Sequence, residues 1–143
     1  FARDFIRAHY ILGEAYRLSG QFELAEHHLS EEALLRCRAI NLVEAEPDIL
    51  LSLGYLCYNQ AQYKEAKSLV VEALSITERS GYVLQGADVN LFLAQYALEQ
   101  EKDTVKAKEY AESALKLAYC DGPPYYYKVA YDEAERMLER LNA

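Results

Sequence analysis

The chain has 143 residues, of which 52% are hydrophobic, and its 23 acidic and 15 basic side chains give a formal net charge of -8. This length and apolar content are sufficient for one domain with a buried core. The negative charge repels phosphate groups, which excludes nucleic acid and anionic membrane surfaces as default partners and favours a partner with basic groups.

Residues 1–41 form the first of three similar units. The segment YILGEAYRLSGQFELAEHHL, which starts at Tyr10, places apolar residues three and four positions apart. This spacing predicts two helices joined by a turn. Asn41 follows the second helical stretch. Because asparagine accepts the left-handed backbone conformation that ends many helices, we expect the unit to end there.

Residues 42–81 repeat this pattern. The segment LSLGYLCYNQAQYKEAKSLV aligns with the first one and places Gly54 opposite Gly13, which gives a repeat interval of about 41 residues. Pro47 lies shortly before this segment, and proline is tolerated in the first turn of a helix because the N–H that it lacks has no partner there. Gly81 ends the unit as a residue that accepts the left-handed conformation.

Residues 82–122 contain the third copy, LFLAQYALEQEKDTVKAKEYA, with one extra residue in its turn. Small residues keep the repeat interval, because Ala25, Ala66 and Ala107 occupy the same position in the three successive units. Gly122 again marks the end of the unit. Small side chains at one fixed interval predict helix pairs that pack closely and are stabilised by their neighbours.

The motif CDGPPYYY separates the third unit from the end of the chain. We expect Asp121 and Gly122 to stop one helix and Pro123 and Pro124 to start the next, with the three tyrosines on its first turn. Residues 123–143 place apolar or small residues at helical spacing. They are therefore predicted to form a seventh helix that caps the preceding helices.

The details of each unit resemble a known family. The first two units place a leucine beside a small residue, such as Leu12 with Gly13, then an aromatic residue in the turn, such as Phe22, and alanine three residues later. This pattern resembles the tetratricopeptide repeat (TPR) family over nearly the whole chain. The resemblance implies an all-α fold, a right-handed α-solenoid of three antiparallel helix pairs with a C-terminal capping helix, in a single domain.

The chain departs from the family in two respects. Its units are about seven residues longer than the usual repeat. In the first unit, Ala33 lies one residue later than the family pattern predicts. We therefore expect long helices and an irregular first unit.

The resemblance also implies a binding surface, because the first helix of each pair in this family lines a concave groove. The matching positions form the predicted peptide groove: Arg7, Tyr10, Glu14, Arg17, Asp48, Leu51, Tyr55, Tyr58, Asn59, Asp88, Leu91, Gln95, Leu98 and Glu99. Apolar and aromatic residues between charges are typical of surfaces that bind an extended or helical peptide.

One class of peptide is disfavoured. Chaperone-binding members of the family hold the terminal carboxylate of a peptide with lysine, asparagine and arginine. The matching positions in this chain carry Tyr10, Glu14, Leu51 and Tyr55 instead. The acidic residues of the predicted groove, Asp48 among them, favour positively charged groups of a partner, with an affinity that weakens in salt.

The tail CDGPPYYYKVAYDEAERMLERL also looks like the end of helical-repeat sensor segments in large bacterial signalling NTPases of the STAND type. This second resemblance implies an alternative function as an architectural or self-association segment of such a protein. The chain begins at Phe1 without a methionine, which is expected of a piece of a longer protein. No GxxxxGK[ST] run for nucleotide binding occurs in it.

Histidines are the first candidates for site chemistry. His28 and Glu32 are four residues apart and are expected on one helix face, as two metal ligands would be, whereas the adjacent His27 points elsewhere. His9 stands apart in the sequence and is interpreted as a packing or surface residue. Because no motif supplies further ligands, we expect no metal site.

Cysteines are the second candidates. Cys37, Cys57 and Cys120 are odd in number and lack CxxC spacing, which argues against a disulfide framework or a zinc site and favours a reducing, cytoplasmic location. Cys37 and Cys57 fall at packing positions, and no histidine base lies close to Cys120 in the sequence. The sequence therefore predicts a non-catalytic protein-interaction module without a metal or cofactor.

Overall fold

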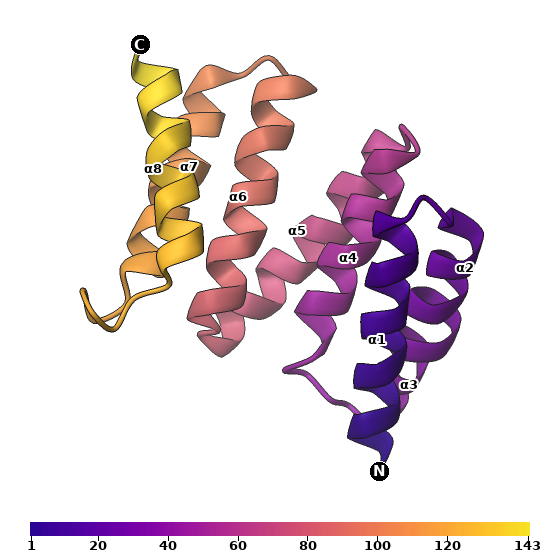
Figure 1. The fold of residues 1–143 in the computed structure, drawn as a ribbon. Coiled ribbons are helices and arrows are strands. Elements are labelled where there is room, and N and C mark those ends of the chain that lie inside the picture. Colours follow the sequence, from indigo (N-terminus) through magenta and orange to yellow (C-terminus); the bar gives the residue numbers. More distant parts are fainter. The chain divides into compact units, whose positions relative to one another are not determined.

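The computed structural model describes residues 1–143, and all of their regular structure is helical, which confirms the all-α prediction (Figure 1). The elements are α1 (Ala2–Leu18), α2 (Phe22–Glu26), η1 (His27–Leu34), α3 (Leu35–Ala39), α4 (Glu46–Asn59), α5 (Tyr63–Ser80), α6 (Val83–Glu99), α7 (Thr104–Tyr119) and α8 (Lys128–Asn142). The chain divides into two compact units, Phe1–Ile76 and Thr77–Ala143. None of the helices has both the length and the apolar character that a bilayer crossing requires.

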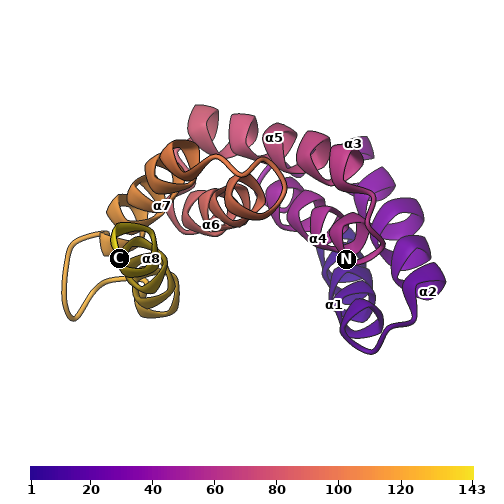
Figure 2. The same ribbon diagram turned by 90° about the horizontal axis from the view of Figure 1, so that it is seen from above.

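In the first unit, α2, η1 and α3 follow one another without a break and form one long element, the second helix. It packs against α1 and α4. The two ribbon views show α4 between α1 and the start of α5 (Figure 1, Figure 2). The core of this unit contains completely buried aliphatic side chains, among them Leu29, Leu50 and Leu56. Apolar burial on this scale is the main source of stability for such helices.

The irregularity that the sequence predicts in the first repeat, residues 1–41, is present as a π-helical segment, η1. Ala25, Leu29, Ala33 and Cys37 lie at steps of four and are all completely buried. At 3.6 residues per turn, each such step would drift about 40° around the helix and carry the later residues off the core face. The wider π winding absorbs the extra residue before Ala33 and keeps all four side chains inward.

The ends of the three sequence repeats carry the predicted left-handed residues. Asn41, Gly81 and Gly122 have φ angles of 56°, 69° and 82°, respectively. Glycine adopts this conformation without strain, and asparagine adopts it more readily than most residues. The sequence prediction for these three helix ends is therefore confirmed.

A second series of left-handed residues lies in the turns inside the helix pairs. Gly20, Ala61 and Lys102 have φ angles of 81°, 60° and 53°. They occupy the same position in the three sequence repeats, so the backbone conformation of these turns recurs at the same interval as the sequence pattern. Only the first turn has glycine at this position. In the other two turns, a residue with a side chain adopts a backbone conformation that is unfavourable for it.

In the second unit, α7 packs against both α6 and α8. The contacts are made largely by alanine: one core cluster contains Ala87, Ala114, Ala118, Ala130 and Ala134 together with Leu91. A second cluster combines Ala94 and Ala111 with Met137. Ala130, Ala134 and Met137 of the stripe that the sequence predicts for the last helix are thus buried, and Leu138 and Leu141 are partly buried. α8 covers α7 and part of α6.

The prediction that the two prolines start the last helix is wrong. Pro123 and Pro124, which are joined by a cis peptide bond, lie in the turn between α7 and α8. α8 begins at Lys128 with Tyr127 as its N-cap, so the three tyrosines precede the helix.

Main-chain hydrogen bonds explain this shape of the turn. The Gly122 N–H donates to the Tyr119 carbonyl at 2.7 Å, and the Tyr125 N–H donates back to the Gly122 carbonyl at 2.7 Å. The Tyr127 N–H donates to the Ala118 carbonyl at 2.8 Å. Because these bonds hold the residues after the prolines against the end of α7, the segment cannot continue directly into a helix.

Candidate functional site

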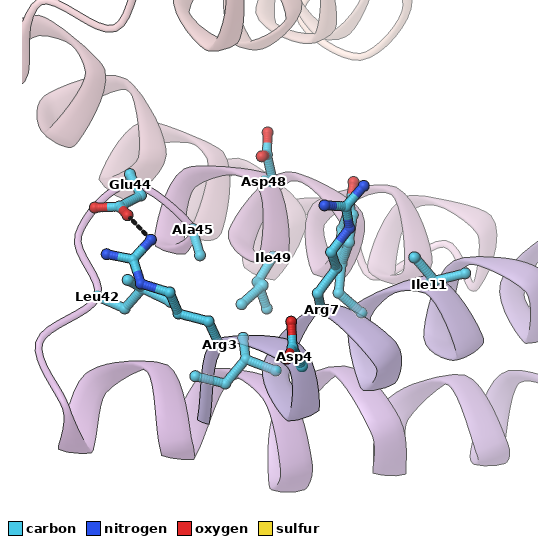
Figure 3. A pocket seen from close by; sticks show the side chains of 11 residues that line it. Arg3, Asp4, Arg7, Ile11, Leu42, Glu44, Ala45, Asp48 and Ile49 are labelled. Atoms are coloured by element: carbon cyan, nitrogen blue, oxygen red, sulfur yellow. Dashed lines mark hydrogen bonds and ion pairs between the residues drawn. The ribbon is translucent and has the colours of Figure 1, made fainter. Parts of the chain in front are cut away.

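The structure brings several predicted groove residues together between α1 and α4. A pocket of about 530 Å³ opens there, which we call the α1–α4 pocket (Figure 3). α1 supplies one wall, including Arg7 and Tyr10, and residues 40–45 with the start of α4 supply the other, including Asp48. A pocket of this size is in the range that holds a ligand group or a side chain of a partner.

The floor of the α1–α4 pocket is aliphatic. Ile6 from α1, Leu42 from the linker and Ile49 from α4 line it and are 2%, 9% and 1% exposed. Ile6 and Ile49 lie on the inward faces of their helices, and Leu42 is held by a hydrogen bond from its N–H to the Cys37 carbonyl at 2.9 Å. The floor can therefore take an apolar group without moving these side chains.

Charged side chains surround this floor. At one end, Arg3 Nη1 donates to Glu44 Oε1 at 2.5 Å (Figure 3). The side chains of Asp4 and Arg7 are exposed and form no ion pair. In Figure 3 the side chains of Arg7 and Asp48 extend to the same side, away from Ile49. The rim thus offers charges of both signs next to an apolar floor.

A second group of predicted groove residues forms a polar cluster, the Arg17 cluster. Arg17 Nε and Nη2 donate to Glu14 Oε1 and Oε2 at 2.6 and 3.1 Å, and Arg17 Nη1 donates to Asn59 Oδ1 at 3.0 Å. The guanidinium carbon lies 5.2 Å from the centre of the Tyr55 ring. These side chains are already paired with one another, and such bidentate charged contacts are among the stronger ones in proteins.

Two predicted groove residues of α4 lie elsewhere. The Tyr58 ring packs edge-on against Tyr63 of α5, with ring centres 5.0 Å apart, so it is directed toward the neighbouring helix. Leu51 is half-buried. Neither residue lines the α1–α4 pocket.

In the second unit, α8 and the residue that precedes it cover two of the predicted positions. Tyr127 precedes α8, and its hydroxyl donates to both carboxylate oxygens of Asp88 at 3.0 and 3.1 Å. Leu91 is 5% exposed and packs in the cluster with Ala130 and Ala134 of α8. Leu91 is therefore a core residue in this structure and not a free groove residue, because the alanines let α8 approach closely.

The other predicted positions of α6 are more open. Gln95 is exposed and lines a pocket of about 620 Å³ together with Arg136 and Met137 of α8. Leu98 is half-buried and Glu99 is exposed at the end of the helix. The pocket beside Gln95 lacks the buried aliphatic floor of the α1–α4 pocket, with Met137 as its single buried apolar side chain.

The histidine candidates do not form a metal site. His27 Nδ1 lies 2.8 Å from Glu31 Oε2, and His27 Nε2 lies 3.7 Å from Glu32 Oε1. No group of three or more histidine, cysteine, aspartate or glutamate side chains is placed to hold a metal ion. His9 is not isolated, because its ring contacts that of His28 across the α1–η1 interface.

The thiols differ in environment. Burial, with a smaller effect of Glu46, raises the pKa of the Cys37 thiol to about 11, and burial with Glu65 raises that of Cys57 to about 11. Both thiols are therefore protonated near neutral pH and are poor nucleophiles. Cys120 is exposed, and its thiol lies 3.4 Å from the Leu117 carbonyl.

Sequence reasoning missed the floor of the α1–α4 pocket and its ion pair. Ile6 and Ile49 carry only the general helical signal of a core residue, and the linker residues Leu42 and Glu44 lie between the aligned segments. The interval between Arg3 and Glu44 equals the repeat and is the one signal that could have connected them.

No family model, curated protein or solved structure matches this chain.

Proposed function

We propose that the chain is a non-catalytic, TPR-like interaction module that binds a peptide or protein segment. In this proposal, the three helix pairs and α8 form a right-handed α-solenoid of one domain. The α1–α4 pocket carries the proposal, since its aliphatic floor lies below exposed charges and its wall includes Arg7, Tyr10 and Asp48 from the predicted groove. The constant repeat interval in the sequence supports the solenoid.

The chemistry of the pocket favours a particular kind of segment. An aliphatic side chain of the partner fits the floor formed by Ile6 and Ile49. The exposed Arg7 guanidinium, which has several N–H donors, can bind backbone carbonyls of an extended peptide. Asp4 and the net charge of -8 favour a basic residue next to the aliphatic anchor.

Selection of peptides from a random display library against the 143-residue chain tests this proposal. We expect selected peptides to combine an aliphatic residue with lysine or arginine and to bind more weakly in high salt. Arg7→Ala and Tyr10→Ala should each weaken the best peptides about tenfold in a titration, as residues at the centre of an interface do.

Lys108→Ala is the matched control, because Lys108 is an exposed cation of α7 outside the α1–α4 pocket. It should leave the dissociation constants unchanged. The proposal is refuted if selected peptides bind Arg7→Ala and Tyr10→Ala as tightly as the unmodified chain while circular dichroism shows both variants folded.

Self-association is the second candidate function, and one observation favours it. The end of the first helix pair exposes Phe1 and Ile40 beside a small pocket of about 230 Å³ that Phe5 and Ala39 also line. Arg36 lies over the Phe5 ring, 4.2 Å from its centre. Such an apolar end suits an architectural segment of a larger signalling protein that packs on another copy.

Sedimentation equilibrium separates the two candidates. Self-association predicts dimers that Ile40→Lys dissociates, whereas Val105→Lys, at an exposed apolar residue of α7, leaves them intact. A monomer over the whole accessible concentration range would rule out this second function. It would leave the peptide-binding proposal standing.

A further inference from the structure

His9 of α1 and His28 of η1 face each other across the interface between α1 and the second helix. Their Nδ1 atoms are 2.8 Å apart, and the rings are stacked with centres 5.0 Å apart. His28 also stacks on Tyr16, at 5.3 Å, and His9 contacts the Phe5 ring, at 4.2 Å. Both histidines are half-buried. The pair is therefore part of the packing and not a chance contact of surface side chains.

The distance between the two Nδ1 atoms restricts how many protons the pair can hold. With both rings neutral, one Nδ1–H donates to the lone pair of the other Nδ1. One added proton can go to Nε2 of the donor ring, which leaves this hydrogen bond in place and makes it charge-assisted. A second proton must take the Nδ1 lone pair of the acceptor. Two N–H donors would then face each other at 2.8 Å.

The charges around His28 do not compensate for a second proton. α1 presents His9 and the Tyr16 ring, and η1 presents His27 and Glu32. Burial lowers the pKa of His28, the two other histidines lower it further, and Glu32 alone opposes them. Glu32 also lies 3.5 Å from Arg36 of α3. No charge of α2 or α4 contributes to this shift.

We propose that His9 and His28 form a proton-sensitive latch, which holds α1 against the second helix when it carries at most one proton and releases it when both rings are charged. The free energy of unfolding decreases as pH is lowered, because the unfolded chain binds the second proton more readily than the folded chain does. The loss begins as pH drops below the ordinary histidine value of 6.5. It continues until the folded chain is protonated too.

The latch has a consequence for the α1–α4 pocket. α1 carries Arg3, Arg7 and Tyr10 of its wall, so release of α1 would dismantle the pocket in acid. This consequence rests on the proposed function, whereas the latch itself does not. It is therefore tested on the chain without a peptide.

The direct test is an NMR titration of the three histidines in the unmodified chain between about pH 8 and pH 5. We expect one of His9 and His28 to be the Nδ1–H tautomer at high pH. The two rings should titrate in coupled steps, with the second proton bound at least about tenfold more weakly than the first. Independent titration of both rings with ordinary, single-step curves would refute the latch.

Urea unfolding at each pH gives the second readout. His9→Asn keeps an amide near the Nδ1 position but cannot titrate, so it removes the second protonation of the pair and leaves the other two histidines in place. From pH 8 to pH 5, His9→Asn should lose at least about twofold less stability than the unmodified chain does. If His9→Asn follows the unmodified chain, the latch is refuted; if it fails to fold, the titration decides.

Discussion

The side chain of Leu29 in η1 fills the space that a side chain at Gly13 in α1 would need. A Cβ atom on Gly13 would lie 2.7 Å from Leu29 Cδ2, which is closer than real carbon contacts. Leu29 is completely buried, so moving it aside would disturb the close-packed side chains around it. The small residue at this position thus sets how closely α1 approaches the second helix, as the sequence pattern predicts.

Gly13→Ala is therefore expected to destabilise the fold. Overpacking against Leu29 costs about 1–3 kcal/mol. The better helix propensity of alanine offsets about 1 kcal/mol of this loss. Gly86→Ala is the matched control, because its new Cβ would lie 3.1 Å from only the end of the Leu117 side chain. Urea unfolding should show a loss for the first variant and none for the second. Equal effects would show that the Leu29 contact adapts.

The left-handed turns allow a stabilising substitution. Ala61 has a φ angle of 60°, a conformation that costs a residue with a Cβ about 1–2 kcal/mol and glycine almost nothing. Ala61→Gly should raise the free energy of unfolding by about 0.5–1 kcal/mol, after the larger entropy of unfolded glycine is subtracted. Ala8→Gly, at an exposed helical position of α1, should lower it by about 1 kcal/mol. A loss in both variants would contradict the turn geometry.

The helices and their ends could be predicted because each rests on local signals. The three- and four-residue spacing marks the helices, and Asn41, Gly81 and Gly122 mark the ends of units through their own backbone preferences. Even the irregular first unit follows from one extra residue before Ala33. That it takes the form of a π segment follows from the need to bury Leu29 and Cys37 together.

Other features depend on tertiary contacts that one sequence does not reveal. Proline is compatible both with a first helical turn and with a loop, and the bonds from the tyrosine amides back to Ala118 and Gly122 decide for a loop. Likewise, Leu91 fits either a groove or a core. The alanines of α8 bring that helix over it and make it a core residue.

The buried thiols predict selective alkylation. Near pH 8, iodoacetamide should label Cys120, which is exposed, and spare Cys37 and Cys57, which are buried and whose pKa values are about 11. Mass spectrometry of the native chain should show one modification, and three after denaturation in urea. Fast native labelling of Cys37 would mean that residues 40–45 open readily.

The same thiols predict alkaline destabilisation. A thiol whose pKa is raised on folding stabilises the fold fully below its unfolded value of 9.0, and this contribution is lost as pH rises through about 11. Cys37→Ala should lose less stability than the unmodified chain over this range. Cys120→Ala is the control, since it removes an exposed thiol outside the core, and it should follow the unmodified chain.

Two arginines of α1 are expected to respond differently to the same change. The Arg17 and Glu14 side chains are only 13% and 27% exposed, so Arg17→Met leaves Glu14 and Asn59 without their donor while it keeps an apolar side chain in place. This should cost about 1–3 kcal/mol in urea unfolding. Arg7→Met, at an exposed residue without an ion pair, should stay within about 0.5 kcal/mol.

The comparison also separates two roles within the predicted groove. If Arg17 maintains the fold and Arg7 is available to a partner, then Arg7→Met should reduce binding of a selected peptide without a change in stability. Arg17→Met should instead lower the stability of the fold. Added salt should lower the stability of the unmodified chain more than that of Arg17→Met, because salt screens the contact between Arg17 and Glu14. Equal stabilities of the two variants would place Arg17 among the residues free for binding and would overturn this division.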